Sequence, residues 1–104
     1  MGELAMVIKT KAQPGMRERL FDLYREILVP RAEENDAQRV VVWSADQNDA
    51  DTFYLFEVYA DASAMGANAS APWFAEYMAK AAPLLATEPD VAMATPMWTK
   101  GITP

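Results

Sequence analysis

The most constraining feature of this chain is a pair of strand-like runs, residues 39–45 and 52–59, joined by the polar segment 46–51. Both runs are rich in β-branched and aromatic residues, which predicts a β-hairpin. Successive side chains of a strand point to opposite faces of its sheet. Here large apolar side chains occupy consecutive positions, so both faces of the hairpin are apolar: Val40, Val41, Val42, Trp43, Phe53, Tyr54, Leu55, Phe56 and Val58.

The N-terminal part predicts a strand and then a helix. Over residues 3–11 apolar residues alternate with their neighbours, which is strand periodicity. The following apolar residues recur at spacings of three and four and predict an amphipathic helix: Met16, Leu20, Leu23, Tyr24, Ile27 and Leu28. Pro30 predicts a kink or a tightened turn near the end of this helix, because proline removes a backbone hydrogen bond. Residues 31–36 are mostly polar and are expected to form a polar exit from this helix.

The C-terminal half predicts two further helices and a last strand. Capping residues and prolines mark the ends of the helices: Asp61 and Ser63, then Ser70 with Pro72, and finally Pro83. Residues 90–99 alternate in character and predict a strand that Pro96 interrupts. Because proline cannot donate to a strand ladder, we expect this strand at a sheet edge.

The predicted order β-α-β-β-α-β is the split βαβ or ferredoxin-like arrangement, an α+β fold with an antiparallel four-stranded sheet. In this arrangement the first and third strands lie centrally, and the last lies at an edge. A chain of 104 residues has the size of one domain, so we expect a single domain over residues 1–104. Since crossovers within a sheet are right-handed, both helical segments should cover the same face.

The opposite face is therefore expected to be apolar and uncovered. Each large apolar side chain left in water forfeits roughly 1.5 to 3 kcal/mol, and a contiguous patch of this size is unusual on a soluble monomer. Two copies packed face to face around a two-fold axis would cover both patches. We expect a homodimer through the open sheet face, with a ligand cleft on that face as the alternative.

Charge and hydropathy limit the partners. The formal net charge is −6, from 15 acidic and 9 basic residues with no basic run. This balance argues against nucleic acid and an anionic membrane as partners, and it favours a small neutral or aromatic molecule. Residues 1–11 contain no signal-peptide core, and no stretch reaches the roughly 18 apolar residues of a membrane span. We expect a soluble, cytoplasmic protein.

The sequence contains neither histidine nor cysteine. This excludes Ser-His-Asp and Cys-His catalysis as well as ordinary zinc and haem sites. No GxGxxG or P-loop motif is present. The acidic segment 46–51 lacks the mid-loop glycine and the closing glutamate of an EF-hand, so we expect a solvated turn there. We therefore expect no metal and no cofactor.

Three segments resemble the antibiotic biosynthesis monooxygenase family, small dimeric α/β-barrel proteins that include cofactor-free quinol and anthrone oxygenases. They are KAQPGMRE at residues 11–18, DADTFYLFEVY at 49–59 and ANASAPWF at 67–74. The resemblance covers nearly the whole chain. It implies a homodimer with a pocket between the helices and the sheet of each protomer.

The resemblance also implies where site residues lie. Many relatives carry histidine at the position of Asn68, and often again at Trp73, whereas this chain has none. An imidazole base and haem ligation by histidine are therefore impossible here. The anthrone-type oxygenases of the family use asparagine and tryptophan near this segment, and Asn68 and Trp73 resemble those residues in type.

Cofactor-free oxygenation suits this restricted set of side chains. An electron-rich phenol or hydroquinone, once deprotonated, can itself give an electron to dioxygen, so the protein needs only to bind, ionise and shield it. We assign catalytic roles to Asn68 as an oxyanion donor, Trp73 as a stacking partner and N–H donor, and Glu57 as a base. Three tyrosines and two methionines are assigned to substrate binding: Tyr54, Tyr59 and Tyr77 as proton relays, and Met65 and Met78 as a deformable apolar lining.

These assignments have alternatives. Asn68 could act only as a local capping residue at a helix junction. Trp73 and Tyr77 could be simple core residues, and Glu57 could pair with a cation at the sheet rim. For the whole protein, an isomerase or lyase of the same superfamily would use the pocket for proton transfer alone. A non-catalytic small-molecule-binding dimer would need none of these roles.

Overall fold

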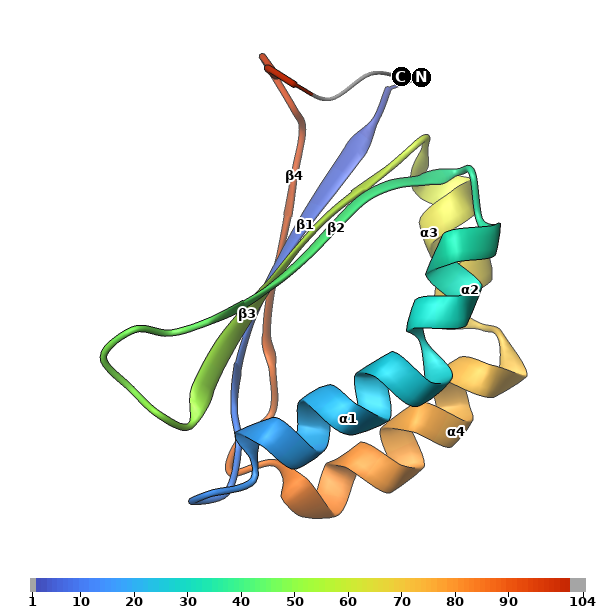
Figure 1. Cartoon of the computed structure of the whole chain (residues 1–104). Helices are drawn as coiled ribbons and strands as arrows, with labels where there is room; N and C mark the ends of the chain where they lie inside the picture. The colour runs from blue at the N-terminus through green and yellow to red at the C-terminus, as the bar shows by residue number, and fades with distance from the viewer. Residues whose placement is uncertain (1, 102–104) are drawn as a thin grey trace.

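The computed structural model describes residues 2–101 and shows one sheet with helices packed against a single side (Figure 1). None of the described helices has the length and apolar character that crossing a membrane requires. The elements follow the predicted order, with each helical crossover divided in two: β1 (Leu4–Lys11), α1 (Arg17–Ile27), α2 (Val29–Glu34), β2 (Gln38–Ala45), β3 (Thr52–Tyr59), α3 (Ala62–Ala69), α4 (Pro72–Ala81), the 3-10 turn η1 (Ala82–Leu84) and β4 (Asp90–Ala94).

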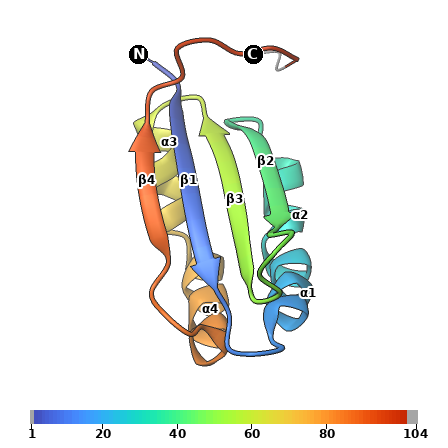
Figure 2. The ribbon, with the colours of Figure 1, turned by 90° about the vertical axis from the view of Figure 1, so that its left-hand side faces the viewer.

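The four strands form one antiparallel sheet in the order β2-β3-β1-β4 (Figure 2). β1 pairs with β3 from Leu4 opposite Tyr59 to Lys11 opposite Thr52. The first and third strands are therefore central and the last is an edge strand, which confirms the predicted α+β ferredoxin-like topology. Within one chain the sheet stays open, with β2 and β4 as its edges.

The first crossover is interrupted at Leu28, as the position of Pro30 predicts. α1 ends at Ile27, and Pro30 occupies the first turn of α2, where a missing N–H costs no helical hydrogen bond. α2 then continues to Glu34. The prediction of a polar exit over residues 31–36 is therefore wrong for most of that segment, because Pro30 begins a new helix instead of ending the previous one.

Caps and prolines also delimit the second crossover. The Asp61 carboxylate accepts a 2.8 Å hydrogen bond from the Ala64 N–H at the start of α3. Pro72 is the first residue of α4, and α4 ends at Ala81, two residues before Pro83. These boundaries agree with the sequence prediction, since each residue acts at the helix position that suits it.

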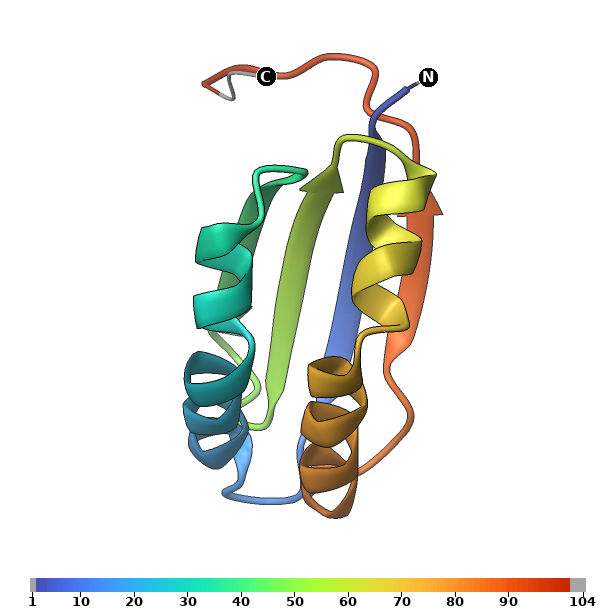
Figure 3. The ribbon, with the colours of Figure 1, turned by 90° about the vertical axis from the view of Figure 1, so that its right-hand side faces the viewer.

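The helices stand in two columns on the same face of the sheet, α1 and α2 in one and α3 and α4 in the other (Figure 3). Alternate residues of β3 are buried beneath them: Phe53, Leu55, Glu57 and Tyr59. The core joins this row to buried residues of the helices and the first loop: Ala12, Leu20, Leu23, Tyr24, Tyr77 and Ala81. The covered face of the sheet is thus where any internal site must lie.

No helix of the described residues lies on the opposite side of the sheet (Figure 2). We call it the bare face and define it by Val7, Val40, Val42, Phe56 and Val58. Val7, Phe56 and Val42 form one row across three strands and are 36%, 44% and 47% exposed, respectively. Both sides of the hairpin are therefore apolar and only one is covered within the chain, as the sequence predicts.

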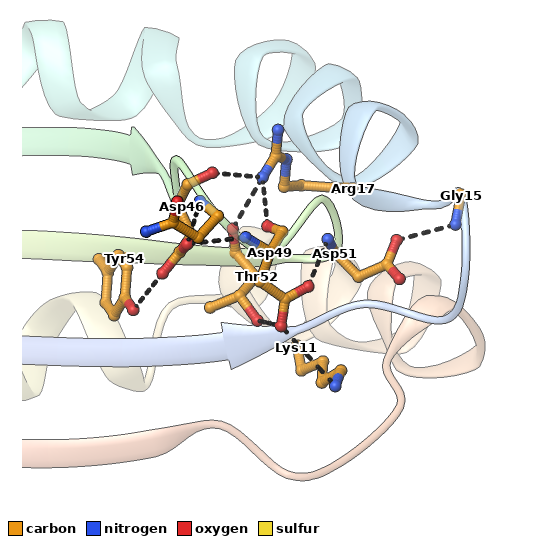
Figure 4. A network of polar contacts seen from close by, with 9 residues as sticks. Lys11, Gly15, Arg17, Asp46, Asp49, Asp51, Thr52 and Tyr54 are labelled. Carbon is orange, nitrogen blue, oxygen red and sulfur yellow. Dashed lines mark hydrogen bonds and ion pairs between the residues drawn. The ribbon is translucent and has the colours of Figure 1, made fainter.

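A polar network closes the β2–β3 hairpin (Figure 4). The side chain of Asp46 accepts hydrogen bonds of 2.7 and 2.8 Å from two backbone N–H groups of the loop. From α1, Arg17 Nη1 donates to three backbone carbonyls, those of Asp46 at 3.2 Å, Asp49 at 2.9 Å and Thr52 at 3.1 Å. The acidic segment is therefore a turn, as predicted, and Arg17 connects this turn to α1.

Candidate active site

A cavity of about 260 Å³ lies between the helices and the covered face of the sheet. Every strand and every α-helix of the described chain contributes to its wall. The wall is mostly apolar: Met6, Ile8, Leu28, Phe53, Leu55, Met65, Phe74, Met78, Leu85, Val91 and Met93. Val91 and Met93 on β4 are 53% and 54% exposed, which places the opening of the cavity beside this edge strand.

The cavity wall contains few ionisable side chains. Glu57 is its only charged residue among those described, and no lysine or arginine lines it. Within residues 2–101 no three histidine, cysteine, aspartate or glutamate side chains gather in a way that could hold a metal ion. The cavity therefore suits a small, largely apolar molecule that is recognised by hydrogen bonds.

A cluster of hydrogen-bonding side chains surrounds Glu57. Glu57 and Tyr59 lie two residues apart on β3, so both point to the covered face. The Tyr59 hydroxyl donates to Glu57 Oε1 at 2.7 Å, and Gln38 Nε2 on β2 is 3.1 Å from both Glu57 Oε1 and the Tyr59 hydroxyl. Both donors therefore hold the same oxygen of the carboxylate.

Asn68 extends this cluster to the helices. From the last turn of α3, its Nδ2 donates to the Tyr59 hydroxyl at 3.2 Å, and its Oδ1 accepts from Asn35 Nδ2 at 3.2 Å. Asn35 is itself fixed by a 3.0 Å bond from the Ala37 N–H to its Oδ1. The Asn68 side chain thus connects α3, β3 and the end of α2. A local capping role would not explain these two tertiary hydrogen bonds.

Glu57 is only 6% exposed. Burial raises the pKa of its carboxyl above the ordinary value of 4.5, and the hydrogen bonds from Tyr59 and Gln38 offset part of this effect. Its second oxygen, Oε2, accepts no hydrogen bond from the described residues, yet it keeps contact with the cavity. A carboxylate held at one oxygen and open at the other can act as a proton acceptor.

Two further tyrosines line the cavity from the helices. Tyr24 on α1 and Tyr77 on α4 are 5% and 8% exposed, and their rings pack edge to face with centroids 6.1 Å apart. Burial and then the charge of Glu57 raise the pKa of both phenols, that of Tyr77 to about 12. Both hydroxyls therefore remain protonated at neutral pH.

Trp73 lines the cavity from the first turn of α4. Its ring meets Phe74 edge-on, with centroids 6.5 Å apart, and the guanidinium of Arg31 lies 5.9 Å from its ring centroid. Met65 and Met78 add flexible apolar surface to the same wall. These side chains give this part of the cavity wall an aromatic and apolar surface.

The structure brings seven of the eight predicted site residues to this cavity: Glu57, Tyr59, Met65, Asn68, Trp73, Tyr77 and Met78. Tyr54 lies elsewhere. Because it is three residues before Glu57, strand alternation turns it away from the covered face. Its hydroxyl donates to Asp46 Oδ2 at 2.6 Å (Figure 4). The prediction of Tyr54 as a substrate-binding residue is corrected accordingly, whereas the roles of the other seven stay predictions.

Three residues of the site, Gln38, Asn35 and Tyr24, are not marked as site residues by the sequence. Simple alternation would place Gln38 on the same face as Val40, but a register shift between them turns Gln38 to the covered face. Asn35 reaches Asn68 only through the folded chain, and no local pattern marks this contact. Tyr24 belongs to the apolar stripe of the first helix, and this pattern alone predicts only a helix face that packs against the sheet.

Solved structures share this fold. One from Chloroflexus aurantiacus J-10-fl, provisionally named an antibiotic biosynthesis monooxygenase, has a TM-score of 0.84 at 22% identity and covers 98% of this chain and 100% of its own. One from Caulobacter crescentus CB15, with the same provisional name, has a TM-score of 0.86 at 16% identity and covers 93% and 92%. A protein of unknown function from Nitrosomonas europaea has a TM-score of 0.81 at 25% identity and covers 100% and 98%. No protein-family model and no curated protein matches the chain.

Fold and cavity together define the class: an α+β ferredoxin-like protein with a largely apolar internal pocket. The solved structures support the resemblance to the antibiotic biosynthesis monooxygenase family that the sequence indicates. At identities of this order, what the likeness shows is the fold. Since one fold can support many different reactions, the reaction depends on the residues of the site.

Proposed function

We propose that this chain is a cofactor-independent monooxygenase that uses dioxygen to oxidise a small phenolic, quinol or anthrone-type aromatic substrate. The observation that supports this most directly is Glu57, a buried carboxylate with a raised pKa and one open oxygen, in an otherwise uncharged apolar cavity. A weakly acidic aromatic needs such a base, because proton transfer is most efficient when the base is tuned upward from its ordinary pKa.

The proposed reaction begins with transfer of a proton from the substrate to Glu57. The substrate anion then gives one electron to dioxygen, and the resulting substrate radical and superoxide combine to form a peroxide. Return of the proton from Glu57 and loss of water leave a quinone. One substrate and one dioxygen thus give one quinone and one water, so Glu57 ends as it began and no external reductant is consumed.

The surrounding residues have separate tasks in this scheme. Tyr59 and Gln38 hold Oε1 of the carboxylate, which leaves Oε2 for the substrate proton. Asn68 uses one amide hydrogen on Tyr59, and its second amide hydrogen can bond a substrate oxygen. Trp73 supplies an aromatic surface for stacking. The apolar wall excludes water and thereby protects the peroxide from side reactions.

We also propose that two copies pair through the bare face. Its row of Val7, Phe56 and Val42 leaves large apolar side chains in water in a single chain. Beyond β4, Met97 and Trp98 add exposed apolar surface, at 90% and 79% exposure. Packing two such faces around a two-fold axis would remove both patches from water at once, which favours a homodimer over a monomer.

An oxygen electrode tests the proposed function directly. The purified, metal-free protein is given a panel of hydroquinones and anthrones, and oxygen uptake is compared with the spontaneous rate. Glu57→Gln should lose the enzymatic component, whereas Glu76→Gln, an exposed glutamate on α4 that is paired with Lys80, should keep it. No uptake above the spontaneous rate with any substrate would overturn the proposal.

The same panel separates the alternatives. Exchange of substrate hydrogen for deuterium from solvent, without oxygen uptake, would indicate an isomerase or lyase that uses Glu57 for proton transfer alone. Saturable binding with neither exchange nor uptake would indicate a non-catalytic binding protein. Each of these outcomes contradicts the monooxygenase proposal.

A further inference from the structure

Tyr24 and Tyr77 carry hydrogen-bond donors that no other residue in the described range 2–101 uses. No acceptor among the described residues takes either hydroxyl, although both side chains are more than nine-tenths buried. Buried polar groups normally find a partner, so two unused hydroxyls in one place call for an explanation. Neither hydroxyl is sealed off, and both residues line the cavity. Their missing partner therefore belongs inside the cavity.

These two hydroxyls differ from the other polar groups of the site. Tyr59 donates to Glu57 and accepts from Asn68 and Gln38, so its hydroxyl is already saturated. Tyr24 belongs to α1 and Tyr77 to α4, and these helices stand in opposite columns (Figure 3). The two rings pack edge to face with their centroids 6.1 Å apart. The charge of Glu57 on β3 acts on both phenols. Both tyrosines line the same cavity as the carboxylate.

We propose that the hydroxyls of Tyr24 and Tyr77 form a two-donor oxyanion site, which binds the phenolate or enolate oxygen of the substrate after Glu57 has taken its proton. This inference rests on the proposed function and deepens it. It assigns the main stabilisation of the anion to a tyrosine pair, of which the sequence analysis identified only Tyr77. Preorganised donors aimed at a developing charge are commonly among the largest contributions to catalysis.

The charge balance of the cavity agrees with this assignment. Before proton transfer the negative charge lies on Glu57, and afterwards it lies on the substrate oxygen, so the cavity holds one negative charge throughout. Among the residues that the structure describes, no lysine or arginine lines the cavity to neutralise that charge. Hydrogen-bond donors must therefore stabilise it, and a protonated phenol is a strong donor to an anionic oxygen.

Binding of phenols tests the site without turnover. Dissociation constants are measured for 4-nitrophenol, whose phenolate has its own visible absorption band, and for nitrobenzene, which has nearly the same shape but no hydroxyl. The proteins are the full-length wild type, Tyr24→Phe, Tyr77→Phe and Tyr54→Phe. Tyr54→Phe is the matched control, because its hydroxyl lies outside the cavity and is bonded to Asp46. Circular dichroism and thermal melting check that each variant is folded.

We expect Tyr24→Phe and Tyr77→Phe each to bind 4-nitrophenol about tenfold more weakly or worse, on the order of one lost charge-assisted hydrogen bond. Nitrobenzene binding should change less than twofold, and Tyr54→Phe should match the wild type with both ligands. Glu57→Gln should bind the phenolate form more tightly than the wild type, because the competing negative charge is gone.

Equal losses for both ligands would show that the tyrosines only shape the cavity, and would overturn the inference. Unchanged 4-nitrophenol binding in both variants, or no binding of 4-nitrophenol by the wild type, would overturn it as well. The oxygen electrode separates this failure from failure of the proposed function. If phenol binding depends on the two tyrosines but no oxygen is consumed, the oxyanion site is supported and the monooxygenase proposal is refuted.

Discussion

Tyr59 donates a 2.7 Å hydrogen bond to Glu57 from two positions further along the same strand. Because side chains alternate along β3, both residues point to the covered face, and the rigid backbone of a central strand fixes their separation. The bond occupies Oε1 and leaves Oε2 open to the cavity. A local property of one strand thus positions the proposed base.

Replacing Glu57 with glutamine should abolish most of the activity. Glutamine keeps the size of the side chain and can accept the Tyr59 hydrogen bond, but it cannot take a proton from the substrate. We expect the turnover number to fall by about 10²- to 10⁴-fold, the usual contribution of a positioned general base. Oxygen uptake at saturating substrate measures this change, and a loss of less than threefold would show that another group is the base.

Tyr59→Phe should shift the pH dependence of the reaction. The Tyr59 hydrogen bond lowers the pKa of Glu57, so its removal should raise that pKa further. The activity requires the deprotonated carboxylate, and the rising limb of the pH–rate profile should therefore move to higher pH. A residue with a merely structural role would lower the rate without moving the profile. A profile that stays in place would contradict this role for Tyr59.

Glu57 should make the folded protein less stable as the pH rises. Its folded pKa is raised above the ordinary 4.5, so in this range the folded state binds more protons than the unfolded state. The contribution of Glu57 is therefore most favourable below about pH 4.5 and is lost as the pH rises through the raised pKa. Urea unfolding of wild type and Glu57→Gln at several pH values measures the difference. As the pH rises, the unfolding free energy of Glu57→Gln should increase relative to that of the wild type. A decrease relative to the wild type would contradict a raised pKa for Glu57.

Arg17→Met should destabilise the fold without reaching the cavity. One guanidinium nitrogen of Arg17 donates to three carbonyls of the β2–β3 hairpin and ties this loop to α1. Hydrogen bonds from a charged donor are worth about 1.5 to 3 kcal/mol, and we expect a loss of that order in the free energy of unfolding. Arg19→Met, at an exposed position of the same helix, is the control and should change the urea midpoint little.

Phe56→Lys tests the proposed pairing of two copies. Phe56 is 44% exposed in the middle of the bare face, between Val7 and Val42. A lysine there would bring two like charges into the interface of a face-to-face dimer. Sedimentation should show a dimer for the wild type and a monomer for this variant, whereas Ala75→Lys on an exposed part of α4 should stay dimeric. A wild-type protein that sediments as a monomer at micromolar concentration would refute the pairing.

The fold could be predicted from the sequence because local signals and tertiary packing agree. Strand alternation, the helical stripe of α1 and the caps at Asp61 and Pro72 all act through neighbours in the chain. Two element predictions were wrong. Residues 31–34 are helical rather than a polar exit, because a proline can begin a helix as readily as it ends one. The last strand was predicted over residues 90–99 with Pro96 inside it, whereas β4 ends at Ala94, before Pro96.

The site was less accessible to sequence reasoning. Strand alternation alone separates Tyr54 from Glu57, so this assignment could have been avoided. Gln38 could not be placed, because a register shift in β2 reverses the face that alternation predicts. That the Tyr24 hydroxyl has no hydrogen-bond acceptor among the described residues can be recognised only in the folded structure. Such contacts depend on how α1, α4 and β3 come together, which no local pattern records.

Oxygen-isotope labelling tests the proposed chemistry most directly. The metal-free protein is given an anthrone under ¹⁸O₂ in unlabelled water, and the product is analysed by mass spectrometry together with the amount of oxygen consumed. We expect one ¹⁸O atom in each quinone and one O₂ consumed per quinone formed, with both dependent on Glu57. A product that takes its new oxygen from water, or that forms at the same rate with Glu57→Gln, would contradict a monooxygenase built on this carboxylate.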